Sequence, residues 1–205
     1  MGTIFYKIGD KIYVNVTNKC PCDCTFCIRG FGDSVGEDFS GNAVKSLWLE
    51  REPDLAEIKS GFDAIDLDGF TEIVFCGYGE PTERAEVVAE IGEYINSRTD
   101  IPLRLNTNGL VKLINPEFDI SRFRVFDCIS ISLNADNRVN YQKLTRSKFG
   151  EISFDSMLEF AEKMREFTKV FFTVVDTPDF KVDVKKCEKV SRECKVELRV
   201  RKFGM

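Results

Sequence analysis

The positions of apolar residues along the chain predict an opening hairpin followed by alternating helices and strands. The hairpin comprises residues 4–8 and 11–17, two short runs joined by a Gly9-Asp10 turn. Farther along, apolar residues at helical spacing predict helices, and short apolar runs predict the strands between them. We expect helices near residues 54–65, 83–97, 157–167 and 182–191, and strands at residues 72–76, 102–106, 128–133, 170–176 and 195–202.

Repeated strand–helix units of this kind predict an α/β fold with mainly parallel strands. Five or six strands are too few for a complete eight-unit barrel. A partial (β/α)6 TIM-like barrel with an N-terminal hairpin fits the length, and we expect residues 1–205 to form a single domain. Ligands of such folds bind at the carboxyl ends of the strands, so functional residues are expected there.

Polar residues alternate with apolar ones within several predicted strands. Successive side chains of a strand point to opposite faces, so the polar residues of each strand share one face. A parallel sheet buried on both faces is normally apolar throughout, and the pattern therefore indicates a surface built for a polar ligand. An antiparallel sheet with one wetted face is the alternative. The polar positions are Asn15, Thr17, Arg104, Asn106, Ser130, Ser132, Asn134, Arg199 and Arg201.

Composition narrows the classes of function. The chain has 29 lysine and arginine residues against 34 aspartate and glutamate residues, a net charge of −5, and no basic run, which gives little support to nucleic-acid or membrane binding. Neither a signal peptide nor an 18-residue apolar run is recognisable, so a cytoplasmic location is expected. Because the chain has no histidine, a bound metal needs thiolates or carboxylates, and eight cysteines in a reducing compartment indicate metal or redox ligands.

Four cysteines lie within eight residues directly after the predicted hairpin. Cys20, Cys24 and Cys27 have the spacing C-x3-C-x2-C. Thiolates are the ligands of iron–sulfur clusters, and three of them can bind three irons of a cube while the fourth iron stays open. A zinc site or simple buried thiols are the alternatives, although structural zinc ligands usually come as two separated pairs. Cys22, inside the three-residue gap, is interpreted as a bystander.

The other four cysteines are dispersed. Cys76 falls near the carboxyl end of one predicted strand, Cys128 near the start of another, and Cys187 and Cys194 lie in the last predicted units. We expect them to be small buried side chains, because free cysteine often behaves as a small hydrophobic residue. The sequence therefore predicts one cluster only.

The cysteine loop resembles the signature of the radical S-adenosylmethionine (radical SAM) superfamily, C-x3-C-x-aromatic-C, with Phe26 as the aromatic residue. Three later segments resemble further superfamily motifs in the right order. Each alone could be an ordinary turn or strand end. They are Gly77-Tyr78-Gly79-Glu80-Pro81, similar to Gly-Gly-Glu-Pro; Asn106-Thr107-Asn108-Gly109, similar to Thr-Asn-Gly; and Ser132-Leu133-Asn134-Ala135, similar to Ser-Leu-Asp.

The resemblance implies an enzyme in which Cys20, Cys24 and Cys27 hold a [4Fe-4S] cluster. The reduced cluster cleaves S-adenosylmethionine (SAM) to a 5′-deoxyadenosyl radical, with a one-electron donor such as flavodoxin or ferredoxin as partner. The resemblance assigns further residues to SAM binding, with the amino group received by the Gly77–Glu80 segment. Tyr78 departs from the motif by interrupting its glycine pair. The implied cofactor-binding residues are Phe26, Gly77, Gly79, Glu80, Asn106, Ser132 and Asn134.

A narrower resemblance is to the small TatD-associated radical SAM proteins. It is carried by Cys27-Ile28-Arg29, the glycine-bearing stretch at residues 30–41, and Leu47-Trp48-Leu49-Glu50-Arg51-Glu52-Pro53. It implies association with a TatD-type metal-dependent hydrolase. Trp48 is interpreted as a core anchor beneath the loop rather than as a substrate contact.

The expected substrate is a small polar molecule. Arg199 is a candidate to bind an anionic group, because guanidinium pairs well with carboxylate or phosphate, and Arg104 is a second candidate. A solvated edge strand is the alternative explanation of Arg199. Two other functions remain open from the sequence: an activase that generates a glycyl radical on a protein partner, and a zinc-stabilised binding module.

Overall fold

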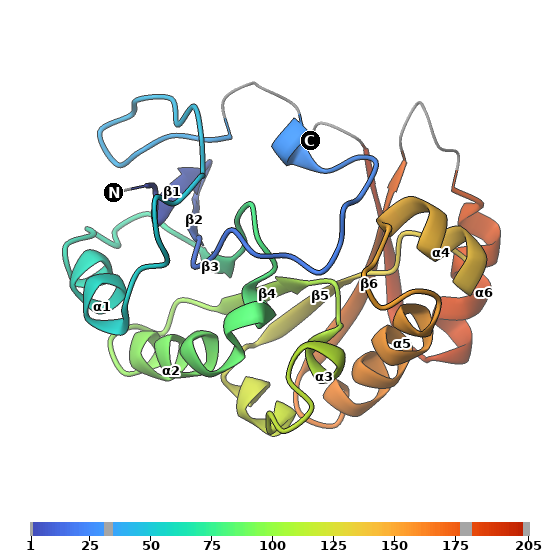
Figure 1. Cartoon of the computed structure of the whole chain (residues 1–205). Helices are drawn as coiled ribbons and strands as arrows, with labels where there is room; N and C mark the ends of the chain where they lie inside the picture. The colour runs from blue at the N-terminus through green and yellow to red at the C-terminus, as the bar shows by residue number, and fades with distance from the viewer. Residues whose placement is uncertain (1, 31–34, 177–181, 203–205) are drawn as a thin grey trace.

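A computed structural model describes residues 2–30, 35–176 and 182–202 of the chain (Figure 1). Its centre is a seven-stranded sheet in which the strands lie in sequence order from β1 to β7. The first pair is antiparallel and every later pair is parallel. The strands are β1 (Phe5–Ile8), β2 (Lys11–Val14), β3 (Glu72–Phe75), β4 (Leu103–Thr107), β5 (Cys128–Ser132), β6 (Lys169–Asp176) and β7 (Glu197–Lys202).

The helices cover one face of this sheet (Figure 1). Because the strand order never reverses, the sheet winds in one direction like a barrel, unlike a doubly wound sheet. Within the described residues β7 does not pair with β1, so the barrel is open, as predicted. The helices are α1 (Leu55–Asp63), α2 (Ala85–Asn96), α3 (Val111–Ile114), α4 (Arg138–Thr145), α5 (Ile152–Met164) and α6 (Val184–Glu193), with 3-10 turns η1 (Ile28–Gly30), η2 (Pro81–Arg84) and η3 (Ile120–Val125).

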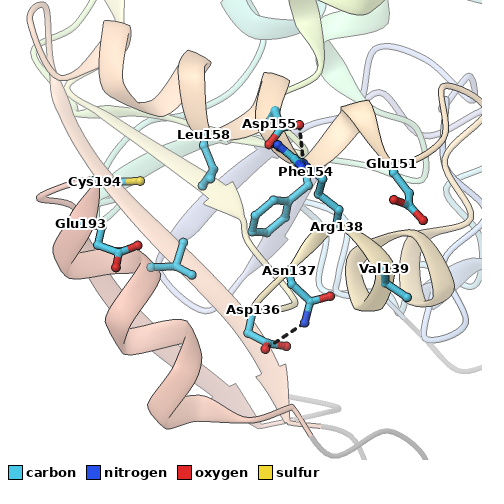
Figure 2. A pocket seen from close by; sticks show the side chains of 11 residues that line it. Asp136, Asn137, Arg138, Val139, Glu151, Phe154, Asp155, Leu158, Glu193 and Cys194 are labelled. Atoms are coloured by element: carbon cyan, nitrogen blue, oxygen red, sulfur yellow. Dashed lines mark hydrogen bonds and ion pairs between the residues drawn. The ribbon is translucent and has the colours of Figure 1, made fainter.

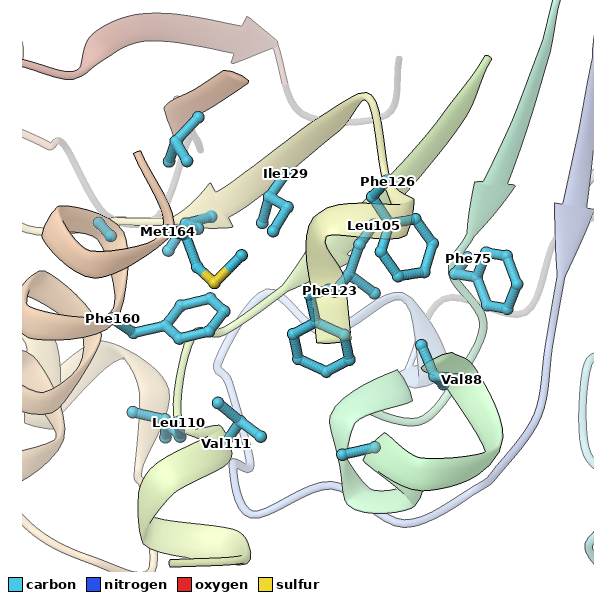
Figure 3. Close-up of a cluster of buried hydrophobic side chains, with 14 of the residues drawn as sticks. Phe75, Val88, Leu105, Leu110, Val111, Phe123, Phe126, Ile129, Phe160 and Met164 are labelled. Atoms are coloured by element: carbon cyan, nitrogen blue, oxygen red, sulfur yellow. The ribbon is translucent and has the colours of Figure 1, made fainter. Parts of the chain in front are cut away.

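The hydrophobic core lies between the helices and the outer face of the sheet (Figure 3). In β4, Leu103 and Leu105 are fully buried on this face, and Arg104 and Asn106 point to the opposite, concave face. Aromatic rings fill the middle of the core, where the ring centroids of Phe75 and Phe126 are 5.1 Å apart at 82°. The predicted separation of a polar and an apolar face is therefore confirmed for β4.

Several predicted boundaries differ from those observed. The helix expected at residues 83–97 is divided into η2 and α2, and the helix expected to reach Phe167 ends at Met164, which leaves Phe167 41% exposed. The elements α3, α4 and η3 were not predicted. Part of the glycine-bearing stretch, residues 31–34, lies outside the described residues. Among the helices that the structure describes, none has the length and apolar character needed to cross a membrane.

Candidate functional site

The cysteine loop follows the carboxyl end of β2 and runs to α4 (Figure 1). Cys20, Cys24 and Cys27 are partly exposed, whereas Cys22 is buried against the core with 6% exposure. The amide of Cys27 donates a hydrogen bond to the carbonyl of Cys24 at 3.1 Å, which closes a tight turn around the half-buried Phe26. The three predicted ligands are therefore partly exposed residues, and the fourth cysteine is buried.

Backbone hydrogen bonds hold this loop against the carboxyl end of α4. The amides of Asp23 and Thr25 donate to the carbonyls of Thr145 and Leu144 at 2.9 and 3.0 Å. The last carbonyls of a helix lack partners within the helix, and the loop supplies two of the missing donors. The position of the cysteines thus depends on an element far away in the sequence.

Two glycines let the segment after β3 lie directly against the stem of the cysteine loop. A Cβ atom on Gly77 would lie 2.0 Å from Oδ1 of Asn15, and one on Gly79 would lie 2.2 Å from the carbonyl oxygen of Thr17. Neither distance is compatible with a side chain. Oδ1 of Asn15 is buried and has no hydrogen-bond partner among the described residues. Close packing therefore explains both predicted SAM-binding glycines: Gly77 lies against the side chain of Asn15, and Gly79 lies against the backbone of Thr17 and Lys19.

Glu80 joins this segment to the one after β4. Its Oε1 accepts hydrogen bonds from the hydroxyl groups of Thr82 and Thr107 at 2.8 and 2.7 Å, and its Oε2 accepts one from the amide of Asn108 at 2.8 Å. Burial raises the pKa of this carboxyl above its usual value, and the hydrogen bonds to its charged form oppose that rise. The amide of Glu80 also donates to the carbonyl of Lys19 at 2.8 Å. Glu80 thus connects the segment after β3 with the end of β4 and with the residues that lead into the cysteine loop.

The remaining predicted cofactor residues lie at the ends of neighbouring strands. Asn106 is near the carboxyl end of β4, and Ser132 ends β5, which pairs with β4 in parallel register. Asn134 follows β5 with a φ of 56°, in the left-handed region that asparagine tolerates, and is 4% exposed. The side-chain nitrogen of Asn108 lies 3.8 Å from the sulfur of Cys22. Adjacent strand ends therefore bring the segments predicted from sequence to one end of the sheet.

The two predicted substrate residues both occur on the concave face. Arg104 forms two hydrogen bonds with the carboxylate of Glu72, at 3.1 and 2.8 Å, so its charge is already paired. Arg199 donates to Glu197 at 3.0 Å, and its guanidinium carbon lies 3.7 Å from the ring centroid of Phe171. The side chain of Arg199 is 44% exposed, against 15% for that of Arg104. Of the two, Arg199 is the more accessible to a ligand.

The cysteines outside the loop are dispersed, as predicted. Cys76 directly follows β3, and Cys128 begins β5. Cys187 and Cys194 are buried in the main core at 0% and 6% exposure. Burial raises the pKa of the Cys187 thiol to about 12, so this thiol stays protonated near neutral pH.

The interpretation of Trp48 as a core anchor is wrong, because its side chain is 51% exposed. Its neighbours Leu47 and Leu49 are buried, and in an extended segment the residue between two inward side chains points outward. The ring of Trp48 packs edge-on against Tyr78, with centroids 5.6 Å apart. Tyr78, which interrupts the glycine pair, belongs to a small second core with Leu47.

Arg29 is the residue near the cysteines whose contact the sequence did not reveal. Its Nε donates to the sulfur of Cys27 at 3.3 Å, and its guanidinium carbon lies 6.0 Å from the centroid of the Trp48 ring. In the sequence, the segment Cys27-Ile28-Arg29 is recognisable as part of a motif. The side chains of Arg29, Cys27 and Trp48 come together only because of the path of the folded chain at residues 27–29 and around Trp48.

The donor set of the loop fits an iron–sulfur cluster. Thiolates are the usual cluster ligands, and the loop supplies three partly exposed cysteines in a chain without histidine. Within the part of the chain that the structure describes, no three cysteine or carboxylate side chains converge on the position of one metal ion. A cluster does not require such convergence, because each thiolate binds a different iron.

A groove of about 580 Å³ lies among α4, α5 and α6 (Figure 2). Its walls include the Arg138–Asp155 ion pair, at 2.7 Å, and the buried Cys194. None of the predicted site residues lines it. The groove belongs to the helical layer, and the predicted ligands lie on the cysteine loop.

Comparison with known proteins bears on the family and the fold. The family model of the radical SAM superfamily matches residues 14–186. A structure of TYW1 with a lysine-pyruvate adduct bound is similar, with a TM-score of 0.67 and 12% identity over 98% of this chain and 67% of that one. Archaeal TYW1 gives a TM-score of 0.59 and 10% identity over 96% and 66%. The chain spans about two thirds of the length of each, and at such identities the likeness shows the fold alone. No curated protein sequence matched the chain.

Proposed function

Because the chain belongs to the radical SAM superfamily and is therefore a radical SAM enzyme, we propose that Cys20, Cys24 and Cys27 bind three irons of its [4Fe-4S] cluster. The proposal is supported by one observation above all: Cys20, Cys24 and Cys27 are partly exposed residues of one loop, whereas Cys22 is buried. When bound, the cluster and SAM supply a one-electron cleavage that yields a 5′-deoxyadenosyl radical for hydrogen abstraction. Cys22 stays a bystander in this proposal.

The segments around Glu80 would hold SAM beside the cysteine loop. The backbone at Gly77 and Gly79 has no side chains of its own and lies next to the stem of the loop, which supports a role in receiving the amino group. Asn106 and Ser132 offer polar side chains at adjacent strand ends for the carboxylate or ribose, with Asn134 just beyond. In this proposal the carboxylate of Glu80 positions the segments, because its oxygens already accept hydrogen bonds from Thr82, Thr107 and Asn108.

The substrate is proposed to be a small polar molecule bound on the concave face. That face carries hydroxyl and amide groups from several strands, among them Ser130 and Thr173. Arg199 is proposed to contact the substrate, since it is accessible and its guanidinium is oriented by Phe171. Arg104 is proposed to line the substrate site beside Arg199. Its guanidinium is already paired with Glu72, so Arg104 is less able to bind a charged group of the substrate.

Anaerobic reconstitution with iron and sulfide tests the assignment of the ligands. After reduction with dithionite and addition of SAM, the wild-type protein is expected to form 5′-deoxyadenosine. Cys24→Ala should abolish product formation and lower the iron content. Cys128→Ala is the matched control, because Cys128 is also a partly exposed cysteine but begins β5, outside the loop; this variant should retain both properties.

Two results would contradict the proposal. One is a Cys24→Ala protein that still binds about four irons and cleaves SAM. The other is a wild-type protein that takes up only zinc under strictly anaerobic conditions.

The finer features predicted from the sequence also belong to the proposal. We expect a single domain, because the main core includes residues from Ile12 to Val196. We also expect a reducing compartment such as the cytoplasm, because eight thiols are free. Flavodoxin or ferredoxin is the expected electron donor. Association with a TatD-type hydrolase is supported by the sequence resemblance that residues 47–53 carry. Co-purification of such a hydrolase with the tagged protein would test it.

A further inference from the structure

The guanidinium of Arg29 is fixed against the cysteine loop by three groups. Its Nε donates to the sulfur of Cys27 at 3.3 Å, within the usual range for sulfur acceptors. Its two terminal nitrogens lie 3.5 Å from the carbonyl oxygens of Asn18 and Cys22. Because all three contacts come from one planar group, the direction of the N–H bond toward sulfur is well defined.

The ring of Trp48 is a further neighbour of this guanidinium. Trp48 lies 6.0 Å from it, a distance at which the face of an indole ring attracts a cation. Trp48 in turn packs against Tyr78, which lies between the two glycines proposed to bind SAM. A continuous chain of contacts therefore connects the proposed SAM segment to one proposed cluster ligand.

We propose that Arg29 is a positioning residue that stabilises the reduced state of the cluster through its hydrogen bond to Cys27. This inference rests on the proposed function, in which Cys27 is a ligand. Reduction adds one negative charge, and a cation that donates a hydrogen bond to a ligand sulfur interacts more favourably with the more negative state. Arg29 therefore makes the cluster easier to reduce. No activity of the loaded enzyme is needed to observe the effect.

The direct test is a redox titration of the reconstituted protein, followed by the EPR signal of the reduced cluster. Arg29→Met is expected to lower the equilibrium constant for reduction about tenfold, which for one electron is a shift of about 59 mV to more negative potential. Lys19→Met is the matched control. It removes a cation from the same loop, but Lys19 pairs with Glu52 at 3.2 Å and is 67% exposed. We expect its equilibrium constant to change less than twofold.

A second variant keeps the test decisive if Arg29→Met holds its cluster poorly. Arg29→Lys retains the charge without the planar group and should give a shift in the same direction that is smaller than that of Arg29→Met. Iron content and the EPR signal of the wild type separate the two proposals. A wild type without a four-iron cluster overturns the proposed function. The role of Arg29 is overturned if the wild type holds the cluster but the reduction potentials of the Arg29 variants shift no more than that of Lys19→Met.

Discussion

Replacing Gly79 with alanine should push the stem of the cysteine loop away from the segment after β3. The new Cβ would lie 2.2 Å from the carbonyl oxygen of Thr17 and 2.7 Å from that of Lys19. Both are backbone atoms, so the clash is relieved only by a backbone shift of about 1 Å, and overpacking of this kind costs about 1–3 kcal/mol. The shift also weakens the hydrogen bond from the amide of Glu80 to Lys19, for about 1 kcal/mol more. The expected loss of unfolding free energy is about 2–4 kcal/mol.

Urea unfolding of the cluster-free protein measures this loss, and iron content after reconstitution measures its effect on the cysteines. We expect the Gly79→Ala protein to bind less iron, because the displaced stem leads directly to Cys20. Gly41→Ala is the control, because Gly41 has a φ of 84° but no atom within 4 Å of an added Cβ. It should cost about 1–2 kcal/mol through left-handed strain and leave iron binding unchanged. A Gly79→Ala protein that loses less than about 0.5 kcal/mol and binds iron normally would refute the reasoning.

Three further predictions concern separate parts of the molecule. Thr107→Val removes a hydrogen bond to the buried carboxylate of Glu80 and should lower the unfolding free energy by about 1–3 kcal/mol in urea; an unchanged midpoint would count against it. Trp48 is the single tryptophan of the chain, so cluster loading should quench its emission, and equal emission with and without the cluster would argue against a nearby cluster. Glu57 accepts hydrogen bonds from Arg51, and these lower the pKa of Glu57 from 4.5 to about 2. The stability that Glu57 contributes is therefore present above pH 4.5 and is lost as pH falls toward 2. Glu57→Gln should flatten the dependence of unfolding free energy on pH in that window, and an unchanged slope would contradict the pairing.

The sheet could be predicted because its signal is local. In β4, the alternation of Leu103 and Leu105 with Arg104 and Asn106 specifies both the strand and the face that meets the helices. The helix α4 gave no such signal. It buries Tyr141, Leu144 and Thr145 near its carboxyl end, and its other positions are polar or exposed. Its importance lies in tertiary contacts with the cysteine loop, which no local pattern encodes.

The candidate site divides in the same way. The spacing of the cysteines and the order of the glycine- and asparagine-bearing segments predicted which loops meet, because parallel strands end at the same edge. The surroundings of Trp48 were predicted wrongly, although the buried Leu47 and Leu49 on either side contain the signal that it points outward. The contact of Arg29 with Cys27 depends on side-chain direction in a turn, and spacing alone does not specify that direction.

The attachment of the cysteine loop to α4 has a consequence for the order of assembly. During synthesis the loop leaves the ribosome long before its support exists, since Asp23 and its ion-pair partner Arg146 are 123 positions apart. Until α4 has folded onto the sheet, four neighbouring thiols stand unshielded and free to oxidise or to bind stray metals. Insertion of the cluster is therefore best timed after translation of the helical layer, when the thiols are already arranged to receive it.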